Sequence, residues 1–213
     1  MNVAVVYVHP RMSVKTYIPA AKRFAQSYLM NPPGATPHEV YVMINGDMPR
    51  AHDLKTFSPL PVRLMTHDNY GKDIGAFQRA ARDIRNCDLM VFCGAHVHFR
   101  QGGWLDVMVN AFERNGPGIF GAYGFHQPHL HIRTTCFWMP PELLLGYPIL
   151  VGNENRYEFE HGPTHGISKW VIDSGFNAWM VTWTGTFPPK DWRHVENHEA
   201  VVLDQHSDRI GYK

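Results

Sequence analysis

Residues 2–8 read NVAVVYV, in which an unbroken run of apolar and mostly β-branched side chains follows Asn2. Such a run is typical of a strand that is buried on both faces of a parallel sheet. Two further runs of this kind follow, EVYVMI at 39–44 and DLMVFC at 88–93. Segments with apolar residues at helical spacing separate the runs, over 13–30 and 73–86. This alternation predicts an α/β fold with a mostly parallel, Rossmann-type central sheet and helices on both faces.

The rest of the chain carries weaker patterns of the same two kinds, and residues 48–61 fit a loop or a short helix. We expect further strands at 62–66, 118–123, 131–139 and 178–183, and further helices at 104–114, 140–145 and 166–174.

The composition is that of an ordinary globular protein without a dominant charge. Of 213 residues, 44% are apolar and 18% charged, and the 20 basic and 19 acidic side chains give a net charge of +1. This balance argues against a strongly basic nucleic-acid-binding surface. Three cysteines without a CxxC pair argue against a disulfide framework or a zinc knuckle. Because we find no basic leader and no stretch long enough to span a bilayer, we expect a cytoplasmic protein.

Polar residues follow the expected strands at the edge where parallel sheets bind ligands. In open α/β sheets the ligand lies beyond the carboxyl ends of the strands. His9 follows the first strand, Asn45 the second, and a polar loop at 67–73 the third. The segment CGAHVHF at 93–99 follows the fourth strand and contains two histidines.

Five segments carry a resemblance to a known family. In order they read NYGKDIGAF (69–77), DLMVFCGAHVHF (88–99), GGWLDVMVNAF (102–112), GIFGAYG (118–124) and HIRTTCFWM (131–139). Their order and spacing resemble the core of glycosyltransferases of the GT-A, nucleotide-diphospho-sugar transferase type, closest to family-two-like and rhamnan-synthesis-like members. The resemblance extends over roughly residues 60–185, and it implies a GT-A-like fold and sugar transfer from a nucleotide-sugar.

The resemblance implies that the residues after the first three strands bind the donor. Backbone N–H groups at a helix N-terminus favour a diphosphate, a lysine adds positive charge, and carboxylates or amides accept hydrogen bonds from the base or the ribose. A second interpretation is that Asp73 only caps the helix and Lys72 only meets solvent. The donor- or nucleotide-binding candidates are His9, Asn45, Asp68, Asn69, Lys72 and Asp73.

His96 occupies the position at which the resembled family carries its acidic metal-binding motif. A neutral imidazole suits Mn²⁺ and other transition metals better than Mg²⁺ or Ca²⁺, whereas a protonated one stabilises a diphosphate without metal. His98 would point the same way in an extended segment. We therefore expect either a divalent metal, with Mn²⁺ favoured, or a metal-independent site at these two histidines.

A carboxylate that takes the proton from the acceptor hydroxyl is expected in the segment RYEFEHG at 156–162. In an extended segment Glu158 and Glu160 would share one face, and Glu160 is preferred because it adjoins a glycine-bearing turn. The alternative is a solvated acidic loop that pairs with Arg156.

Other candidates rest on the resemblance alone. His206 is expected near the metal or the diphosphate and Arg209 near a phosphate, the alternative being a polar, frayed tail. The acceptor candidates are His131, Arg133 and Trp138, which flank or lie on one expected strand.

These observations predict one glycosyltransferase domain over residues 1–213, with a nucleotide-sugar-binding half at 1–125 and an acceptor-binding half at 126–213. The reaction expected is transfer, with inversion, from a UDP-sugar or another nucleoside-diphosphate sugar to a hydroxyl on a glycan, lipid, protein or modified DNA base. Two other functions remain open: a histidine-rich metal-dependent hydrolase, and a non-catalytic relative that binds a nucleotide or a glycan.

Overall fold

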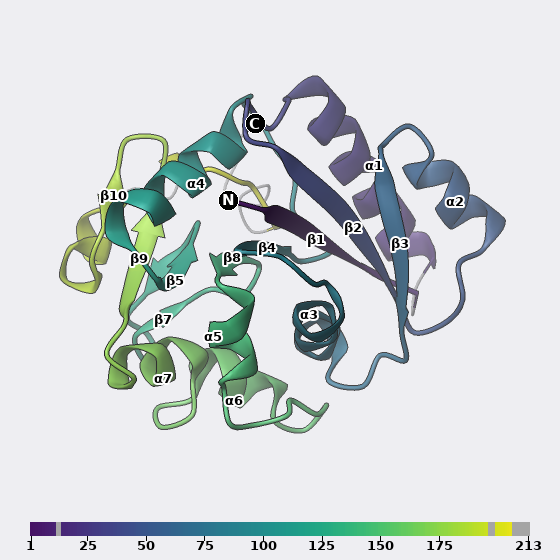
Figure 1. Cartoon of the computed structure of the whole chain (residues 1–213). Helices are drawn as coiled ribbons and strands as arrows, with labels where there is room; N and C mark the ends of the chain where they lie inside the picture. Colours follow the sequence, from purple (N-terminus) through teal and green to yellow (C-terminus); the bar gives the residue numbers. More distant parts are fainter. Residues whose placement is uncertain (12–13, 196–198, 206–213) are drawn as a thin grey trace.

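A computed structural model describes residues 1–11, 14–195 and 199–205, and within them an eight-stranded central sheet lies between helices (Figure 1). Its strand order is β10-β9-β5-β8-β4-β1-β2-β3, and β6 and β7 form a separate two-stranded sheet. The strands are β1 (Val3–Pro10), β2 (His38–Asn45), β3 (Val62–His67), β4 (Leu89–Cys93), β5 (Gly118–Gly121), β6 (Gly124–Phe125), β7 (His131–Ile132), β8 (Cys136–Met139), β9 (Asn177–Val181) and β10 (Thr186–Phe187). The helices are α1 (Val14–Met30), α2 (Ala51–Phe57), α3 (Lys72–Asp83), α4 (Trp104–Asn115), α5 (Pro141–Leu145), α6 (Arg156–His161), α7 (Ile167–Asp173) and the 3-10 helix η1 (Pro189–His194).

Parallel pairing brings the carboxyl ends of the first strands to one edge of the sheet. Strand β1 pairs in parallel with β2 and with β4, and β2 pairs in parallel with β3. The register sets Pro10 beside Asn45, Asn45 beside His67, and Tyr7 beside Cys93. The mostly parallel sheet expected from the sequence is thus confirmed, with β8 inserted antiparallel between β4 and β5.

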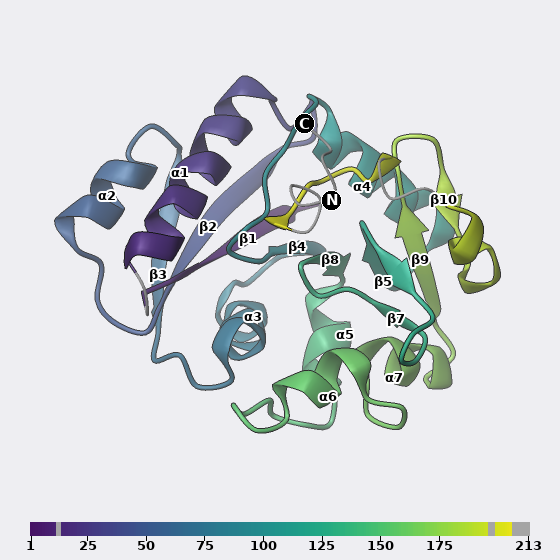
Figure 2. The same cartoon turned by 180° about the vertical axis from the view of Figure 1, so that it is seen from behind.

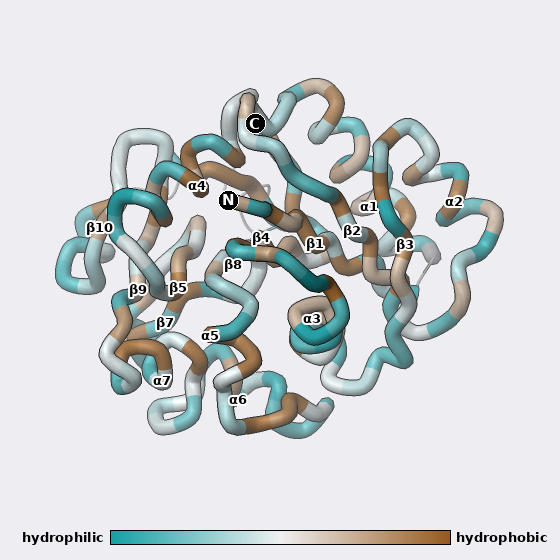
Figure 3. Tube along the Cα trace, viewed as in Figure 1, coloured by the Kyte–Doolittle hydropathy of each residue, from teal (hydrophilic) through white to brown (hydrophobic). Residues whose placement is uncertain are grey.

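The helices cover both faces of the sheet, as expected. Helices α1, α2 and α4 lie on one side and α3, α5, α6 and α7 on the other (Figures 1 and 2). Alternate residues of β1 contribute to the two cores: Val3, Val5 and Tyr7 pack in the first core, and Ala4, Val6 and Val8 in the second. This double burial explains why the strand is a continuous apolar run, and hydrophobic stretches gather around β1 and β4 in Figure 3.

Three local predictions were wrong. The expected strand at 131–139 is divided into β7 and β8, because residues 133–135 leave the sheet and turn toward the cavity described below. Helix α3 begins at Lys72 after a left-handed Gly71 (φ 70°), so Asp73 lies inside the first turn and is not the N-cap. The segment at 156–161 is helix α6 and is not extended, so Glu158 is exposed while Glu160 is buried.

None of the helices in the described part of the chain has both the length and the apolar character that a membrane-crossing helix needs.

Candidate functional site

A cavity of about 480 Å³ opens at the carboxyl ends of β1, β2 and β4. Residues of β1 and β2, the start of α1, the start of α3, the segment after β4 and the chain near residue 204 contribute to its wall. The cavity lies where a doubly wound sheet binds its ligands. The structure brings seven of the expected site residues together in its lining: Asn45, Asn69, Lys72, Asp73, His96, Arg133 and Glu160.

The side chain of Asn45 holds the loop after β3 against the end of β2. Its Nδ2 donates a hydrogen bond to the carbonyl oxygen of Lys72 at 3.0 Å, and its Oδ1 lies 2.9 Å from Nδ1 of His67. Burial lowers the pKa of His67, so this imidazole is neutral near neutral pH. The Lys72 side chain is exposed, at the rim of the cavity.

Two glycines permit the close approach of this loop to its neighbours. A Cβ at Gly71 would lie 2.0 Å from the carbonyl oxygen of Val151, and one at Gly75 would lie 1.9 Å from that of Tyr70. Any side chain at either position would therefore displace backbone. The glycines of the NYGKDIGAF segment thus have a packing role that the structure explains.

Arg156 and Glu160 of helix α6 are held in the cavity wall by hydrogen bonds. Arg156 donates from Nε and Nη2 to the two carboxylate oxygens of Asp73, at 3.0 and 2.8 Å. Glu160 is 6% exposed, and its Oε2 accepts hydrogen bonds from the backbone N–H of Thr134 (3.2 Å) and from the Thr134 hydroxyl. Such a two-point pairing fixes the plane of the guanidinium group.

The charges in the described lining are balanced. Arg133 lies with Nη1 3.4 Å from Oδ2 of Asp204, whose residue is 1% exposed. With Lys72 and Arg156, the lining holds three permanent cations, and its three carboxylates are Asp73, Glu160 and Asp204. Arg133 and Arg156 are thus paired with carboxylates of the wall, and Lys72 is the lining cation at the rim.

The segment after β4 presents His96 to the cavity. The buried Tyr7 hydroxyl donates a hydrogen bond to the carbonyl oxygen of Ala95 at 2.7 Å, which fixes the segment next to β1. His96 is half-buried, and its ring centroid lies 5.7 Å from that of Tyr17. The His98 backbone instead forms an isolated antiparallel bridge with Leu203, and His98 is not among the lining residues. A turn over 94–97 therefore separates two histidines that an extended segment would have aligned.

The residues around His96 do not reproduce a metal centre with paired carboxylates. Within the described ranges, the lining near His96 offers this one imidazole and the carboxylate of Asp204. The single described cluster of three ligand-type side chains lies elsewhere, at His131, Glu160 and His161. The donor set that the described residues offer at the expected acidic position therefore does not fit the metal site that the resemblance implies.

The cluster of His131, Glu160 and His161 joins β7 to the end of α6. One ligand atom from each side chain lies within 4.8 Å of the other two. Nε2 of His161 is 3.1 Å from Oε1 of Glu160, and Nδ1 of His131 lies 2.7 Å from the carbonyl oxygen of His129. Burial lowers the pKa of His161, although the charge of Glu160 opposes this effect.

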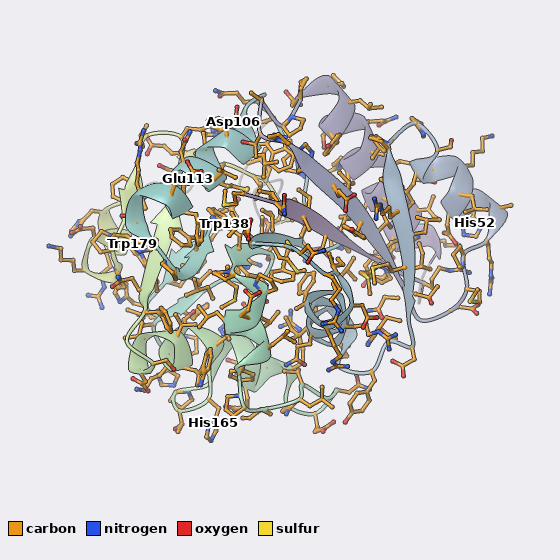
Figure 4. The ribbon with its side chains drawn as sticks, in the orientation of Figure 1. His52, Asp106, Glu113, Trp138, His165 and Trp179 are labelled. Atoms are coloured by element: carbon orange, nitrogen blue, oxygen red, sulfur yellow. The ribbon has the colours of Figure 1, made fainter. Side chains whose placement is uncertain are left out.

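Several expected site residues lie outside the cavity. His9 is 1% exposed and places Nε2 3.0 Å from Oδ1 of the buried Asp53, and burial lowers its pKa. Asp68 lines a separate cavity of about 630 Å³, together with His67 and Tyr70. Glu158 is exposed and is not a lining residue, and Trp138 is fully buried in the sheet, stacked on Phe120 (Figure 4). Trp138 therefore packs in the core and does not reach the cavity.

His206 and Arg209, expected near the diphosphate, lie outside the described residues. Two lining residues, Arg156 and Asp204, were not among the expected site residues. Arg156 occurs in the segment RYEFEHG, but the partner of each residue, Asp73 or Arg133, is more than seventy residues away along the chain.

Comparisons with known proteins agree with the GT-A-like fold. A scan against protein-family models found no match, and no curated protein matches the sequence. Among solved structures, the galactosyltransferase LgtC in complex with donor and acceptor sugar analogs is similar over 80% of this chain and 66% of its own, with 12% identity and a TM-score of 0.50. The mannosyltransferase PcManGT from Pyrobaculum calidifontis, in complex with GDP-Man and Mn²⁺, is similar over 83% of this chain, with 12% identity and a TM-score of 0.55.

The chain spans 66% of the LgtC chain and 53% of the PcManGT chain. These similarities show that the chain has a GT-A-type glycosyltransferase fold, as the resemblance in its sequence implies. At 12% identity they show the fold alone, so the activity has to be argued from the site.

Proposed function

We propose that the 480 Å³ cavity binds a nucleoside-diphosphate sugar and that the protein transfers the sugar, with inversion, to an acceptor hydroxyl. The observation that carries the proposal is the position of Lys72, Arg133 and Arg156 around one cavity at the ligand-binding edge of a GT-A-type sheet. PcManGT, which shares the fold, was solved with a nucleotide-sugar, and this supports a donor of the same class.

The three cations would stabilise the leaving diphosphate. When the bond between the anomeric carbon and the diphosphate breaks, negative charge grows on the departing oxygen. Cations that are already aligned lower the energy of that state more than they lower the energy of the bound donor. Arg156 is aligned by Asp73, Arg133 lies beside Asp204, and Lys72 at the rim would meet the outer phosphate. The His96 side chain would contact the donor directly, without a metal ion between them.

The two halves of the chain would divide the work. Residues 1–125 would hold the nucleotide, with Asn69 accepting or donating hydrogen bonds to base or ribose and Asn45 positioning the loop beside it. Residues 126–213 would form the acceptor side. Both halves reach the same cavity, because Arg133, Arg156 and Glu160 come from the second half.

The three cysteines are all free and buried, which fits the reducing cytoplasm.

The proton of the acceptor hydroxyl has to pass to a carboxylate of the wall. Glu160 is the one of the two expected glutamates that lines the cavity, but Thr134 binds its Oε2 and His161 faces its Oε1. Because both oxygens of Glu160 are engaged, we assign this residue to positioning. Arg156 likewise engages both oxygens of Asp73, so Asp204 is the remaining lining carboxylate for proton transfer.

A binding and turnover assay tests the proposal. Nucleoside-diphosphate sugars with different bases and sugars are titrated into the protein by calorimetry, and released nucleoside diphosphate is measured with a mixed set of glycan acceptors. Loss of one charge-assisted contact costs about 1.5–3 kcal/mol, so Lys72→Ala and Arg133→Ala should each weaken donor binding about 10- to 150-fold. The matched controls are Lys169→Ala on α7 and Arg63→Ala on β3, both exposed and absent from the lining of the cavity.

If the two site variants bound the donor as tightly as the two control variants, the proposed site would be overturned. Tight donor binding without turnover under any acceptor would instead favour a non-catalytic nucleotide-binding protein. Metal-dependent ester cleavage without any donor binding would favour the hydrolase.

A further inference from the structure

We propose that His131, Glu160 and His161 form a binding site for one divalent transition-metal ion, with zinc the best-matched ion. This site lies where β7 meets the C-terminal end of α6, away from the His96 segment at which the resemblance implies a metal. The inference goes beyond the proposed transfer reaction and does not depend on it.

The spacing of the ligand atoms suits a small tetrahedral ion. Zinc binds imidazole nitrogen and carboxylate oxygen at about 2.0–2.2 Å, so two ligand atoms of one tetrahedral ion lie about 3.3–3.5 Å apart. Nε2 of His161 is 3.1 Å from Oε1 of Glu160, and the atom offered by His131 lies within 4.8 Å of both. The two imidazole rings meet edge to face, with centroids 4.4 Å apart. Small side-chain rotations would therefore close the three atoms around one ion.

Neighbouring groups already orient two of the three ligands. Nδ1 of His131 donates to the carbonyl oxygen of His129 at 2.7 Å, which leaves the Nε2 lone pair for a metal. Thr134 holds Oε2 of Glu160 through its N–H and its hydroxyl, which directs Oε1 toward His161. Hydrogen bonds of this kind to the far atom of a ligand are typical of metal sites.

The third ligand has a polar atom without a partner. If Nε2 of His161 carries the proton and donates to Glu160, Nδ1 remains buried with no hydrogen bond in the described structure. If Nδ1 carries the proton, the Nε2 lone pair faces a carboxylate oxygen at 3.1 Å, which is repulsive. A cation between Nε2 and Oε1 removes the repulsion in the second tautomer.

The charges around the cluster allow a cation to bind. Arg156 approaches Oε2 of Glu160 at 3.6 Å, but its charge is matched by the two-point contact with Asp73. Arg133 is similarly paired with Asp204 at 3.4 Å. In the forms that bind a metal, one carboxylate and two imidazoles carry a formal charge of −1, which is complementary to a divalent cation. His161, with a side chain 20% exposed, provides access from solvent.

A bound ion would tie β7 to α6 and stiffen one wall of the donor cavity. Three protein ligands leave a coordination position for water. Because Oε1 of Glu160 would be bound to metal, this glutamate would position Thr134 and Arg156 and would not act as a proton acceptor.

Metal titration of the full chain tests the site. Protein freed of metal with a chelator is titrated with Zn²⁺ against a chromophoric competitor, and the metal content of untreated protein is measured by mass spectrometry. We expect one tight equivalent in the wild type. His131→Ala and His161→Ala should each bind Zn²⁺ at least about 100-fold more weakly, because removing a ligand costs no less than removing a group that orients one. Thr134→Val, which keeps the ligands, should weaken binding about 10- to 100-fold.

The matched control is His165→Ala, which removes an exposed histidine four residues from the site (Figure 4). It should bind Zn²⁺ as the wild type does. Co²⁺ in place of Zn²⁺ provides a readout that needs no variant, because tetrahedral nitrogen and oxygen coordination gives an intense visible absorption band. A wild type without a tight equivalent, or ligand variants and wild type with the same affinity, would overturn the proposal. If a ligand variant does not fold, an octahedral, weak Co²⁺ spectrum of the wild type would overturn it as well.

Discussion

The two-point contact between Arg156 and Asp73 should contribute measurably to stability, and Asp73→Asn tests this. The substitution keeps the size of the side chain and removes its charge. In the wild type Nε and Nη2 of Arg156 donate to Asp73 at 3.0 and 2.8 Å, and the side chains are 28% and 25% exposed. Hydrogen bonds to charged groups contribute about 1.5–3 kcal/mol, and partial exposure favours the lower part of this range. We expect a loss of about 2 kcal/mol in the free energy of unfolding, or roughly 4–8 °C in melting temperature for a chain of this size.

Urea unfolding of the wild type, Asp73→Asn, Arg156→Met and the double variant gives the coupling energy of the pair. We expect about 1–2 kcal/mol of coupling. Arg156 also lies 3.4 Å from the Thr134 hydroxyl and 3.6 Å from Glu160, and only the arginine substitution removes these contacts. Their contribution therefore enters the cost of Arg156→Met and not the coupling energy. In 1 M NaCl the coupling should fall, because salt screens partly exposed charges. A coupling energy below about 0.5 kcal/mol would refute the reasoning.

Two further predictions concern residues that build the site, and a third concerns a carboxylate of helix α4. Tyr7→Phe removes the hydrogen bond to the Ala95 carbonyl and should cost about 1–3 kcal/mol in urea unfolding; an unchanged midpoint would contradict the role given to Tyr7. Gly75→Ala places a Cβ 1.9 Å from the Tyr70 carbonyl and should cost about 1–3 kcal/mol, whereas a stabilised variant would show that the loop yields freely. Asp106 (Figure 4) accepts hydrogen bonds from Ala35 and Thr36; burial alone would raise its pKa, but these bonds lower it. Because its folded pKa is depressed, Asp106 contributes stability above its unfolded pKa of about 4, and this is lost as pH falls through the folded pKa. Asp106→Asn should therefore unfold at lower temperature than the wild type at pH 7, with the difference shrinking toward pH 3; a difference that is constant with pH would contradict this assignment.

The sheet could be predicted because its central strands are unbroken runs of apolar residues. Strand β1 is buried on both faces, so every residue from Val3 to Val8 is apolar and the run needs no partner to be recognised. Helix α6 was missed because it spans only six residues, too few to show a helical period. The strand expected at 131–139 is apolar near both ends, and the sequence does not show that residues 133–135 leave the sheet.

Part of the candidate site could be predicted because the strands that lead to it could be recognised in the sequence. The ends of parallel strands meet at one edge, so Asn45, Lys72 and His96 could be placed together because each lies at or after the end of an expected strand. Long-range partners could not: Arg156 acquires its role from Asp73, and Trp138 is buried because β8 lies between β4 and β5. His98 is turned from the cavity by a backbone bridge to Leu203, a contact over more than one hundred residues.

The central claim is that the diphosphate of a nucleotide-sugar binds among Lys72, Arg133 and Arg156. A crystal structure of the protein with a bound nucleoside diphosphate tests it most directly, with the donor chosen from the calorimetric panel. We expect phosphate oxygens within hydrogen-bond distance of Arg133 or Arg156 and of Lys72, beside His96. A diphosphate bound in the 630 Å³ cavity beside Asp68, or elsewhere on the surface with these three side chains unengaged, would contradict it.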